Sequence, residues 1–388
     1  MRVVFNEDFI NPHPDLLPSK GEGKNLGIIV LKKAKNLLSH FGVGEQVVSA
    51  EPYGSGHVNK SYVVATQNGT GKRYLLQSIS RYVFHDIPAL MDNIARVTDH
   101  IRRKSEIDKH QHILTLLYAA NRPYYQDDAG EYWRLFYFID GAKTYDQVTS
   151  VSQAFEGGRA FGEFLKLVSD LPAPPLHETI PNFHNIDIRL GQLTKALDQD
   201  PLKRAKHVQE NLRFIREHAG QMRFLEELKA SKQIPVRVTH NDTKFNNVLL
   251  DQHGKAICVI DLDTVMPGIV HYDYADSLRT VANTAAEDAS NLNDIGINIE
   301  FFKSFSQGFI SEIKATLTKA EHDTLIPALP VMPFMLALRF LTDYLLGDHY
   351  FKPHFPEHNL QRAKAQLQLS SRFMEQQSDL QKCFKDVD

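Results

Sequence analysis

The residue types with the clearest potential for chemistry lie between residues 238 and 264. The segment VTHNDTKFNNVLL, residues 238–250, places one carboxylate, one ammonium group and several amides between two apolar runs. The segment CVIDLDT, residues 258–264, adds two more carboxylates after a third apolar run. Such oxygen ligands suit Mg²⁺, which proteins usually hold through few side chains together with substrate phosphates. A carboxylate free of metal can take a proton from a hydroxyl group, so the pattern indicates phosphoryl transfer.

Asp242 is the predicted proton acceptor. It follows the expected strand end at residues 236–238, where a loop leaves a side chain within reach of a substrate hydroxyl. The structural alternative is an Asx-turn or a helix N-cap, a common use of aspartate after a strand. Asp242 taken alone leaves both readings open.

Asn247 and Asp261 are the predicted metal ligands. A hairpin that turns at residues 252–255 would return the chain beside itself, so these two side chains are expected to meet. Asp263 is expected to share the metal or to bind another group. In the alternative, the asparagine caps a turn and the aspartates accept hydrogen bonds from loop amides.

A nucleotide site is expected in the N-terminal part of the chain. Gly54 and Gly56 lie at the tip of a predicted hairpin, where backbone N–H groups can approach phosphate oxygens closely. Backbone groups near Phe138 and Ile139 are expected to meet an adenine edge at a hinge over residues 139–141. The alternatives are a glycine turn with a purely conformational role and an ordinary strand-end turn.

Arg339 interrupts the apolar helical segment FMLALRFL at residues 334–341. A buried guanidinium requires a partner, because an unpaired buried charge is costly. Asp343, four residues later, can pair with it on a helix, and contact with a substrate explains the arginine equally well.

The elements that must position these residues change character along the chain. Apolar periodicity and turn residues predict, in the first part, the helices 26–41 and 88–104 and the strands 47–64, 74–77 and 132–139. The later part is predicted to be mainly helical, with helices near residues 302–313, 326–346 and 360–374. We therefore expect an α+β fold with a small β-rich lobe at residues 1–140 and a larger, mainly helical lobe at residues 141–388.

The composition narrows the function classes. The chain has 388 residues, 42% hydrophobic and 23% charged, which is typical of soluble proteins, and its formal net charge of −3 offers no basic field for nucleic acid or anionic lipid. Its two cysteines fit a reducing compartment rather than a disulfide framework. No secretory signal or membrane-spanning run is visible, so we expect a cytoplasmic protein without nucleic-acid or membrane partners.

Several motifs together resemble a known family. The segments HNDTKFNN (240–247) and VIDLDT (259–264) resemble the signature of the aminoglycoside/choline-kinase-like phosphotransferases. The flanking segments YGSGHVN (53–59), DTVMPG (263–268) and LRFLTDYL (338–345), together with GDHYF (347–351), look like those of bacterial N-acetylhexosamine 1-kinases. The similarity covers roughly residues 50–365.

The resemblance implies a fold, a reaction and residue roles. The fold would be protein-kinase-like, and Mg²⁺ with ATP as co-substrate would be required. Asp242 would deprotonate the acceptor, Asn247 and Asp261 would hold the metal, and His240 would support the loop. Thr264 and Arg339 match positions that contact the sugar. The acceptor would be the anomeric hydroxyl of N-acetylglucosamine or N-acetylgalactosamine, and the protein is expected to be a monomer or a weak homo-oligomer.

The sequence also departs from the wider family. Gln77 stands where many members have a lysine that pairs with the ATP phosphates, so the cation for this role is open among Lys60, Lys72, Arg73 and Arg81. Asp263 replaces a glycine of the wider aminoglycoside group, which favours the sugar-kinase branch. The alternatives are a kinase of another hexose, an amino alcohol or an aminoglycoside, and a nucleotide-binding pseudokinase that transfers no phosphate.

Overall fold

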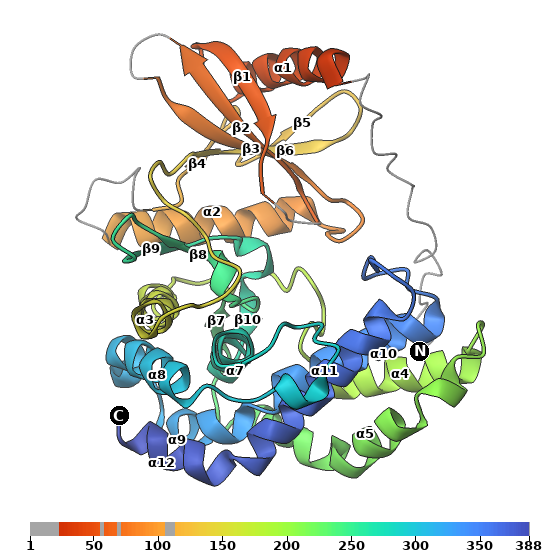
Figure 1. Ribbon diagram of the computed structural model, residues 1–388. Helices are drawn as coiled ribbons and strands as arrows, with labels where there is room; N and C mark the ends of the chain where they lie inside the picture. Colours follow the sequence, from red (N-terminus) through yellow and green to blue (C-terminus); the bar gives the residue numbers. More distant parts are fainter. Residues whose placement is uncertain (1–22, 55–57, 68–70, 105–112, 388) are drawn as a thin grey trace.

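The computed structural model describes residues 23–54, 58–67, 71–104 and 113–387. Within these ranges a β-sheet lobe formed by the first part of the chain stands on a larger helical lobe formed by the rest (Figure 1). This arrangement confirms the predicted α+β, two-lobed fold. The placement of the lobe boundary at residue 140 stays a prediction. Gly56 lies outside the described residues, so its expected role has no structural counterpart.

The N-terminal lobe is built on one antiparallel sheet in the order β1-β2-β3-β6-β4, with β5 also paired to β6. Its strands match the predicted strand segments and add two short ones: β1 (Gln46–Pro52), β2 (Lys60–Gln67), β3 (Arg73–Ile79), β4 (Leu116–Leu117), β5 (Tyr125–Gln126) and β6 (Tyr132–Tyr137). Helix α1 (Gly23–His40) covers one face, and α2 (Ile87–Lys104) lies between the sheet and the helical lobe (Figure 1).

Strand β6 shows how the two faces of the sheet differ. Side chains alternate along a strand, so Trp133 and Leu135 face α1 and join its small apolar cluster. Phe136 points the other way and belongs to the large core shared with α2 and the helical lobe. Arg134 and its cross-strand partner Gln77 have the same parity as Phe136, so the polar pair faces the helical lobe.

The helical lobe surrounds a small β region that carries the candidate site. Its helices are α3 (Val151–Val168), α4 (Ile186–Gln199), α5 (Gln209–Met222), α6 (Phe224–Ala230), α7 (Val270–Val281), α8 (Ile299–Ile313), α9 (Lys319–Ala328), α10 (Val331–Leu346), α11 (His358–Glu375) and α12 (Gln377–Lys385). Short 3-10 helices lie at Ala205–His207 (η1), Phe245–Asn247 (η2), Leu262–Thr264 (η3), Leu292–Asp294 (η4) and Lys314–Thr316 (η5).

Two short antiparallel pairs form the β region. Strand β7 (Arg237–Thr239) pairs with β10 (Met266–Gly268), and β8 (Val248–Leu250) pairs with β9 (Ala256–Val259). The β8–β9 hairpin turns at the predicted residues, where Gly254 adopts a positive φ of 78°. The polar residues of the opening motif therefore lie between β7 and β8.

The predicted helix at residues 326–346 is wrong in its first turn. Pro327 lies in the last turn of α9, Pro330 caps the N-terminus of α10, and the two helices meet at an angle of 51°. A proline that follows a helical turn removes a backbone donor and disfavours continuation of the helix. Apolar periodicity runs through the bend because both helices contribute to the same core.

In the part of the chain that the structure describes, no single helix is both long and apolar enough to cross a membrane. The bent pair α9–α10 meets the length and composition criteria only when the two helices are counted together.

The backbones of helices α3 and α8 touch each other, because glycines lie at the positions where the two helices meet. A Cβ atom on Gly158 would overlap the carbonyl oxygen of Phe305, and one on Gly308 would overlap the carbonyl oxygen of Phe155. These positions leave no room for a side chain. The close packing places Phe161 and Phe164 of α3 against the buried ring of His240.

The packing around the glycines predicts that a Gly→Ala substitution changes stability in opposite directions at two positions. Gly158→Ala should lower the free energy of unfolding by about 1–3 kcal/mol, because the added methyl group forces α3 and α8 apart. Gly191→Ala on α4 is the matched control, since no atom lies within 4 Å of its Cβ position. It should raise stability by about 0.5–1 kcal/mol through helix propensity. Urea denaturation measures both, and equal signs would contradict the packing account.

Candidate active site

Asp273, at the start of α7, holds the loop formed by residues 240–247. Its Oδ2 accepts the backbone N–H of His240 at 2.8 Å, and its Oδ1 accepts that of Asn241 at 2.7 Å. Asn241 has a φ of 64°, in the left-handed region that asparagine tolerates better than most residues. Asp276, one turn later, accepts the N–H of Thr243 at 3.0 Å. Two buried carboxylates therefore determine the course of the loop.

The buried side chain of His240 supports the loop through a hydrogen bond. Its ring is fully buried against Phe161 and Phe164, with centroids 5.9 and 5.6 Å away. Because Ile260 offers a carbonyl oxygen at 2.9 Å from Nε2, that nitrogen carries the proton. The other nitrogen, Nδ1, then accepts the backbone N–H of Asp242 at 3.3 Å. This geometry suits the supporting role expected for His240.

Asp242 presents a partly exposed carboxylate, 28% accessible, at the top of the loop. Its Oδ1 lies 3.2 Å from Nζ of Lys244, and the Asn247 amide donates to its carbonyl oxygen at 2.8 Å and to Oδ2 at 3.3 Å. Burial acts to raise the pKa of Asp242, but the positive charge of the neighbouring Lys244 acts against it and the pKa is lowered. Asp242 is therefore ionised at neutral pH, the form in which a carboxylate can accept a proton.

Asp261 lies beside this loop, as the hairpin predicts. The backbone N–H of Ile260 donates to the carbonyl oxygen of Asn247 at 2.9 Å, and Asp261 follows with a φ of 60°. Solvent reaches part of the Asp261 side chain, but protein atoms surround most of its carboxylate. This burial, with the negative charges of Asp263 and Asp242, raises the pKa of Asp261 to about 7.

These residues fit a divalent cation. A carboxylate whose pKa is raised by its carboxylate neighbours is stabilised when a cation binds. Asn247 uses its amide nitrogen within the loop, and its Oδ1 has no hydrogen-bond partner among the described residues. In the described ranges, no group of three or more acidic, histidine or cysteine side chains is placed so that it could hold a metal ion by itself. One carboxylate and one amide oxygen suit Mg²⁺, which is usually completed by water and substrate phosphates.

Both carboxylate oxygens of Asp263 take part in a contact between the two lobes. Its Oδ1 pairs with the buried guanidinium of Arg134, and its Oδ2 accepts from Asn59 at 2.5 Å. Arg134 also donates through Nε to Gln77 at 2.9 Å, and Gln77 donates to Ser61 at 2.8 Å. Of the two expectations for Asp263, binding to another group is thus the one that the structure supports.

Gln77 accepts a hydrogen bond from Arg134, which was not among the candidate cations, and the choice of the cation that pairs with the ATP phosphates stays open. Lys72 lies over the Tyr137 ring at 5.7 Å, Arg73 pairs with Asp140, and Arg81 reaches the Gly130 carbonyl oxygen at 3.5 Å. None of these contacts involves Gln77. The useful signal was cross-strand register, because Arg134 and Gln77 face each other on β6 and β3.

The expected nucleotide-binding residues lie at the sheet and at the start of the connection between the lobes. Gly54 follows β1 with a φ of 81°, as a tight turn requires. The Phe138 N–H is used by the sheet, since it donates to the Arg73 carbonyl oxygen at 3.0 Å. The Ile139 N–H has no partner among the residues that the structure describes. Of the two predicted positions, Ile139 therefore offers the available backbone donor.

Thr264 and Arg339, the expected sugar contacts, have different surroundings. The Thr264 hydroxyl donates to the His240 carbonyl oxygen at 2.7 Å, so it also supports the loop. The Arg339 guanidinium on α10 lies 5.3 Å from the ring centroids of Phe183 and Phe351 and 5.8 Å from that of Tyr350.

Asp343 is not the partner of Arg339, so the helical ion pair is wrong. The Asp343 carboxylate accepts the backbone N–H groups of residues 349–351 at 2.8–2.9 Å and a side-chain N–H of Asn359 at 3.1 Å. It thereby holds the segment that brings Tyr350 and Phe351 to Arg339. Of the two explanations for Arg339, contact with a substrate is the one left open.

Sequence reasoning missed the residues that act through long-range contacts. Asp273 and Asp276 interrupt the apolar segment VHYDYADSLRTV at three-residue spacing, a signal that could have been read. His184 and Arg189 gave no local signal. His184 donates through Nε2 to the Asn241 carbonyl oxygen at 2.9 Å, and Arg189 lies near Arg339.

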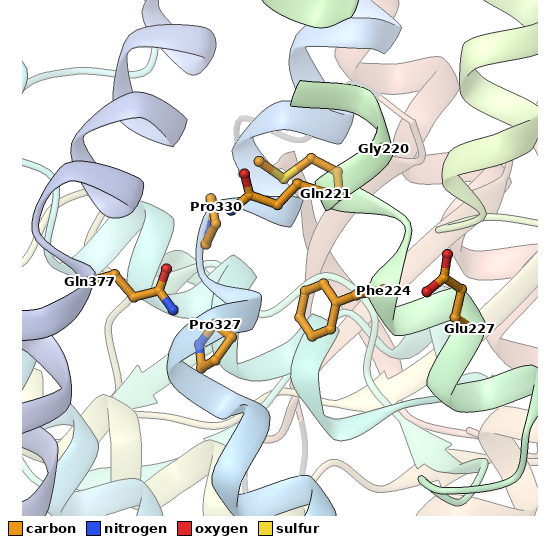
Figure 2. Close-up of a pocket in the computed structure, with 8 residues that line it drawn as sticks. Gly220, Gln221, Phe224, Glu227, Pro327, Pro330 and Gln377 are labelled. Carbon is orange, nitrogen blue, oxygen red and sulfur yellow. The ribbon is translucent and has the colours of Figure 1, made fainter. Parts of the chain in front are cut away.

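A separate cavity of about 370 Å³ lies at the far end of the helical lobe, between α5, α6, α9 and α12. Figure 2 shows the side chains of Gln221, Phe224, Pro327 and Pro330 around it. Its lining contains one carboxylate, Glu227, and none of the loop residues. This cavity has none of the chemistry assembled around Asp242.

The hydrogen bonds between Asp273 and the loop lead to a prediction about stability. Asp273→Asn should lower the free energy of unfolding by about 1–3 kcal/mol, because its amide group would face a backbone donor without accepting from it. Amide hydrogen exchange at residues 240–243 should become faster. Asp379→Asn, at a site whose side chain is 73% exposed, should leave both measurements unchanged. Unaltered exchange in the Asp273 variant would refute the anchoring role.

Comparison with solved structures supports the same architecture. An aminoglycoside phosphotransferase from Alicyclobacillus acidocaldarius aligns with a TM-score of 0.56 at 12% identity, covering 91% of this chain and 96% of that one. An ethanolamine kinase from Plasmodium vivax gives 0.55 at 14% identity, with 91% of both chains covered. Amicoumacin kinase in complex with AMP-PNP, Ca²⁺ and its ligand gives 0.52 at 16% identity, covering 93% and 96%. At these identities the likeness shows the fold, which is protein-kinase-like as predicted.

The sequence supplies the stronger relationship. The model of the phosphotransferase enzyme family, APH, matches residues 49–298, which include most of the sheet, the 240–247 loop and the β8–β9 hairpin. The matched range spans more than half of the chain and contains Asp242, Asn247 and Asp261. This chain belongs to the APH phosphotransferase enzyme family.

Proposed function

We propose that the protein is an ATP- and Mg²⁺-dependent kinase that transfers the γ-phosphoryl group to the anomeric C1 hydroxyl of an N-acetylhexosamine. The observation that carries the proposal of phosphoryl transfer is the ionised, accessible carboxylate of Asp242 beside Asn247 and Asp261. The choice of N-acetylglucosamine or N-acetylgalactosamine, and of C1, rests on the sequence resemblance of the flanking segments.

The donor site would lie between the sheet and the 240–247 loop. Backbone N–H groups near Gly54 would approach the phosphates, and the free N–H of Ile139 would meet the adenine edge. Asn247 Oδ1 and Asp261 would hold Mg²⁺, which neutralises phosphate charge when it is bound. The amicoumacin kinase complex, with its ATP analogue and divalent cation, supports such a donor site in this fold.

Asp242 would take the proton of the acceptor hydroxyl as the phosphoryl group is transferred. Lys244 lies 3.2 Å from this carboxylate and keeps it ionised, and its ammonium group can also face the transferring phosphoryl oxygens. His240 and Asp273 hold the loop in one conformation. The protein needs no covalent intermediate, because positioning and charge neutralisation supply most of the catalysis of phosphoryl transfer.

The acceptor side favours a sugar over an amino alcohol. Arg339 offers N–H donors for hydroxyl or acetamide oxygens, and the rings around it can contact the apolar face of a hexose. Similar solved structures include ethanolamine and choline kinases, whose substrates carry an ammonium group. An ammonium group would be repelled by Arg339 and Arg189. A kinase of another small hydroxylated molecule is the main alternative, and a pseudokinase fits poorly with intact Asp242, Asn247 and Asp261.

The remaining proposals concern the cellular location, oligomeric state and partners of the protein. Both cysteines are free thiols, which fits a cytoplasmic location. We expect a monomer or a weak homo-oligomer that works on small molecules, without a nucleic-acid or membrane partner.

Asp242→Asn should lower kcat by about 100- to 10,000-fold, because an amide cannot take the hydroxyl proton. Nucleotide affinity, measured by calorimetry with an ATP analogue and Mg²⁺, should change by less than about threefold, well under 1.4 kcal/mol. Asp198→Asn on the exposed side of α4 is the charge-matched control and should keep full activity. Near-native kcat in the Asp242 variant would remove this residue from the mechanism.

A panel of sugars and amino alcohols tests the acceptor. With ATP and Mg²⁺, N-acetylglucosamine or N-acetylgalactosamine should be consumed, and ³¹P NMR should show the phosphate at C1. Arg339→Ala should raise the KM for the sugar by about tenfold, or 1.4 kcal/mol, with little change for ATP. A product phosphorylated at C6, or turnover of ethanolamine alone, would show that the proposed acceptor is wrong.

A further inference from the structure

Two arginines lie together on the acceptor side of the loop, and both are held at Phe183. Arg189 of α4 donates through Nη2 to the Phe183 carbonyl oxygen at 2.6 Å and through Nη1 to Gln192 at 2.9 Å. The Arg339 guanidinium of α10 lies 5.3 Å from the centroid of the Phe183 ring. The two cations therefore approach one another around a single residue, although they come from different helices.

Neither guanidinium has a carboxylate partner among the described residues. The nearby Asp343 is used by backbone N–H groups, and Glu226 accepts from Tyr272 and pairs with Lys229 at 2.6 Å. The Nε atom of Arg189 is buried and has no hydrogen-bond partner. Burial and the charge of Arg339 lower the pKa of Arg189 to about 10, so the two groups repel one another.

This local excess of positive charge is not a property of the whole chain, whose net charge is −3. Placing two half-buried cations side by side without a counter-charge costs stability. Buried polar atoms without partners are uncommon in folded proteins, and a bound ion or water is one explanation for them. The missing partner should be an anion, because planar guanidinium groups match carboxylate and phosphate oxygens best.

His184 connects the arginine pair to the reaction site. Its ring lies 4.4 Å from that of Phe183, and its Nε2 donates to the Asn241 carbonyl oxygen at 2.9 Å. Burial, with the charges of Arg339 and Arg189, lowers the pKa of His184 to about 3, so this residue stays neutral. It neither compensates nor adds to the positive charge. His184 and Phe183 therefore connect the arginine pair to the loop that carries Asp242.

We propose that Arg189 and Arg339 form a subsite for a carboxylate or phosphate group carried by the acceptor sugar, away from the hydroxyl that is phosphorylated. The proposal rests on the proposed sugar-kinase function and extends its substrate class to acidic N-acetylhexosamines, which should be preferred over the neutral sugar. Phe351 and Tyr350 close the subsite on the side of Arg339. The other source of negative charge is the transferred phosphoryl group of ATP, which the experiment separates through the two KM values.

The test compares kcat/KM for N-acetylglucosamine with that for three acidic relatives. These carry a carboxylate at C6, a carboxylate on a 3-O-lactyl ether, or a phosphate at C6. At least one acidic sugar should exceed the neutral one by about tenfold or more. Arg189→Gln should reduce that preference by about tenfold with little change for the neutral sugar, and Arg189→Lys should restore part of it. Arg216→Gln, at an exposed position on α5, should change neither value.

Binding without turnover provides a second readout. In an Asp242→Asn background, calorimetry should show tighter binding of the preferred acidic sugar than of N-acetylglucosamine, and Arg189→Gln should remove the difference. Equal or better use of the neutral sugar, or equal losses for both sugars in Arg189→Gln, would overturn the subsite. So would a raised KM for ATP instead of the sugar. If no sugar, neutral or acidic, consumes ATP, the proposed function itself fails, which is a different result.

Discussion

The candidate site depends on one buried interaction, the pair of hydrogen bonds from the Asp273 carboxylate to the backbone N–H groups of His240 and Asn241. A loop after a strand end has unsatisfied donors, and burial without partners would cost about 1–3 kcal/mol for each of them. Asp273 supplies both acceptors from the first turn of α7, and Asp276 supplies a third for Thr243. Burial raises the pKa of Asp273 to about 6, against the opposing effect of these N–H groups and His240. The loop conformation and the burial of this carboxylate therefore require each other.

The charges around the loop are arranged so that each has a separate role. Asp263 forms an ion pair with Arg134 and accepts a hydrogen bond from Asn59, which ties the sheet to the helical lobe and removes one carboxylate from the proposed metal site. Asp242 keeps its negative charge because Lys244 lies next to it. Asp261 has a raised pKa, which binding of a cation would lower again. This division gives the proposed donor side a cation site and leaves positive charge on the proposed acceptor side.

Packing far from the loop determines how well it is held. The glycines of α3 and α8 allow the two helices to touch, and this contact fixes Phe161 and Phe164 behind the His240 ring. His240 also donates a hydrogen bond to the carbonyl oxygen of Ile260, just after the β8–β9 hairpin. A chain of direct contacts therefore connects the core to the loop and to the residue before Asp261, the predicted metal ligand. The helical core of this protein is thus part of the support of its site.

The sequence by itself determined the local features: the strand-rich first part, the helical second part, the hairpin at Gly254 and the motif that places Asp242, Asn247 and Asp261 near one another. Each of these follows from short-range periodicity, turn chemistry or residues close in sequence. Tertiary structure decided the rest. The Arg134–Asp263 contact depends on which distant surfaces pack together, and so does the meeting of Arg189 with Arg339 at Phe183. Residue spacing contains no such information, because a side chain's partner across 100 or more residues is chosen by the packing of the whole core.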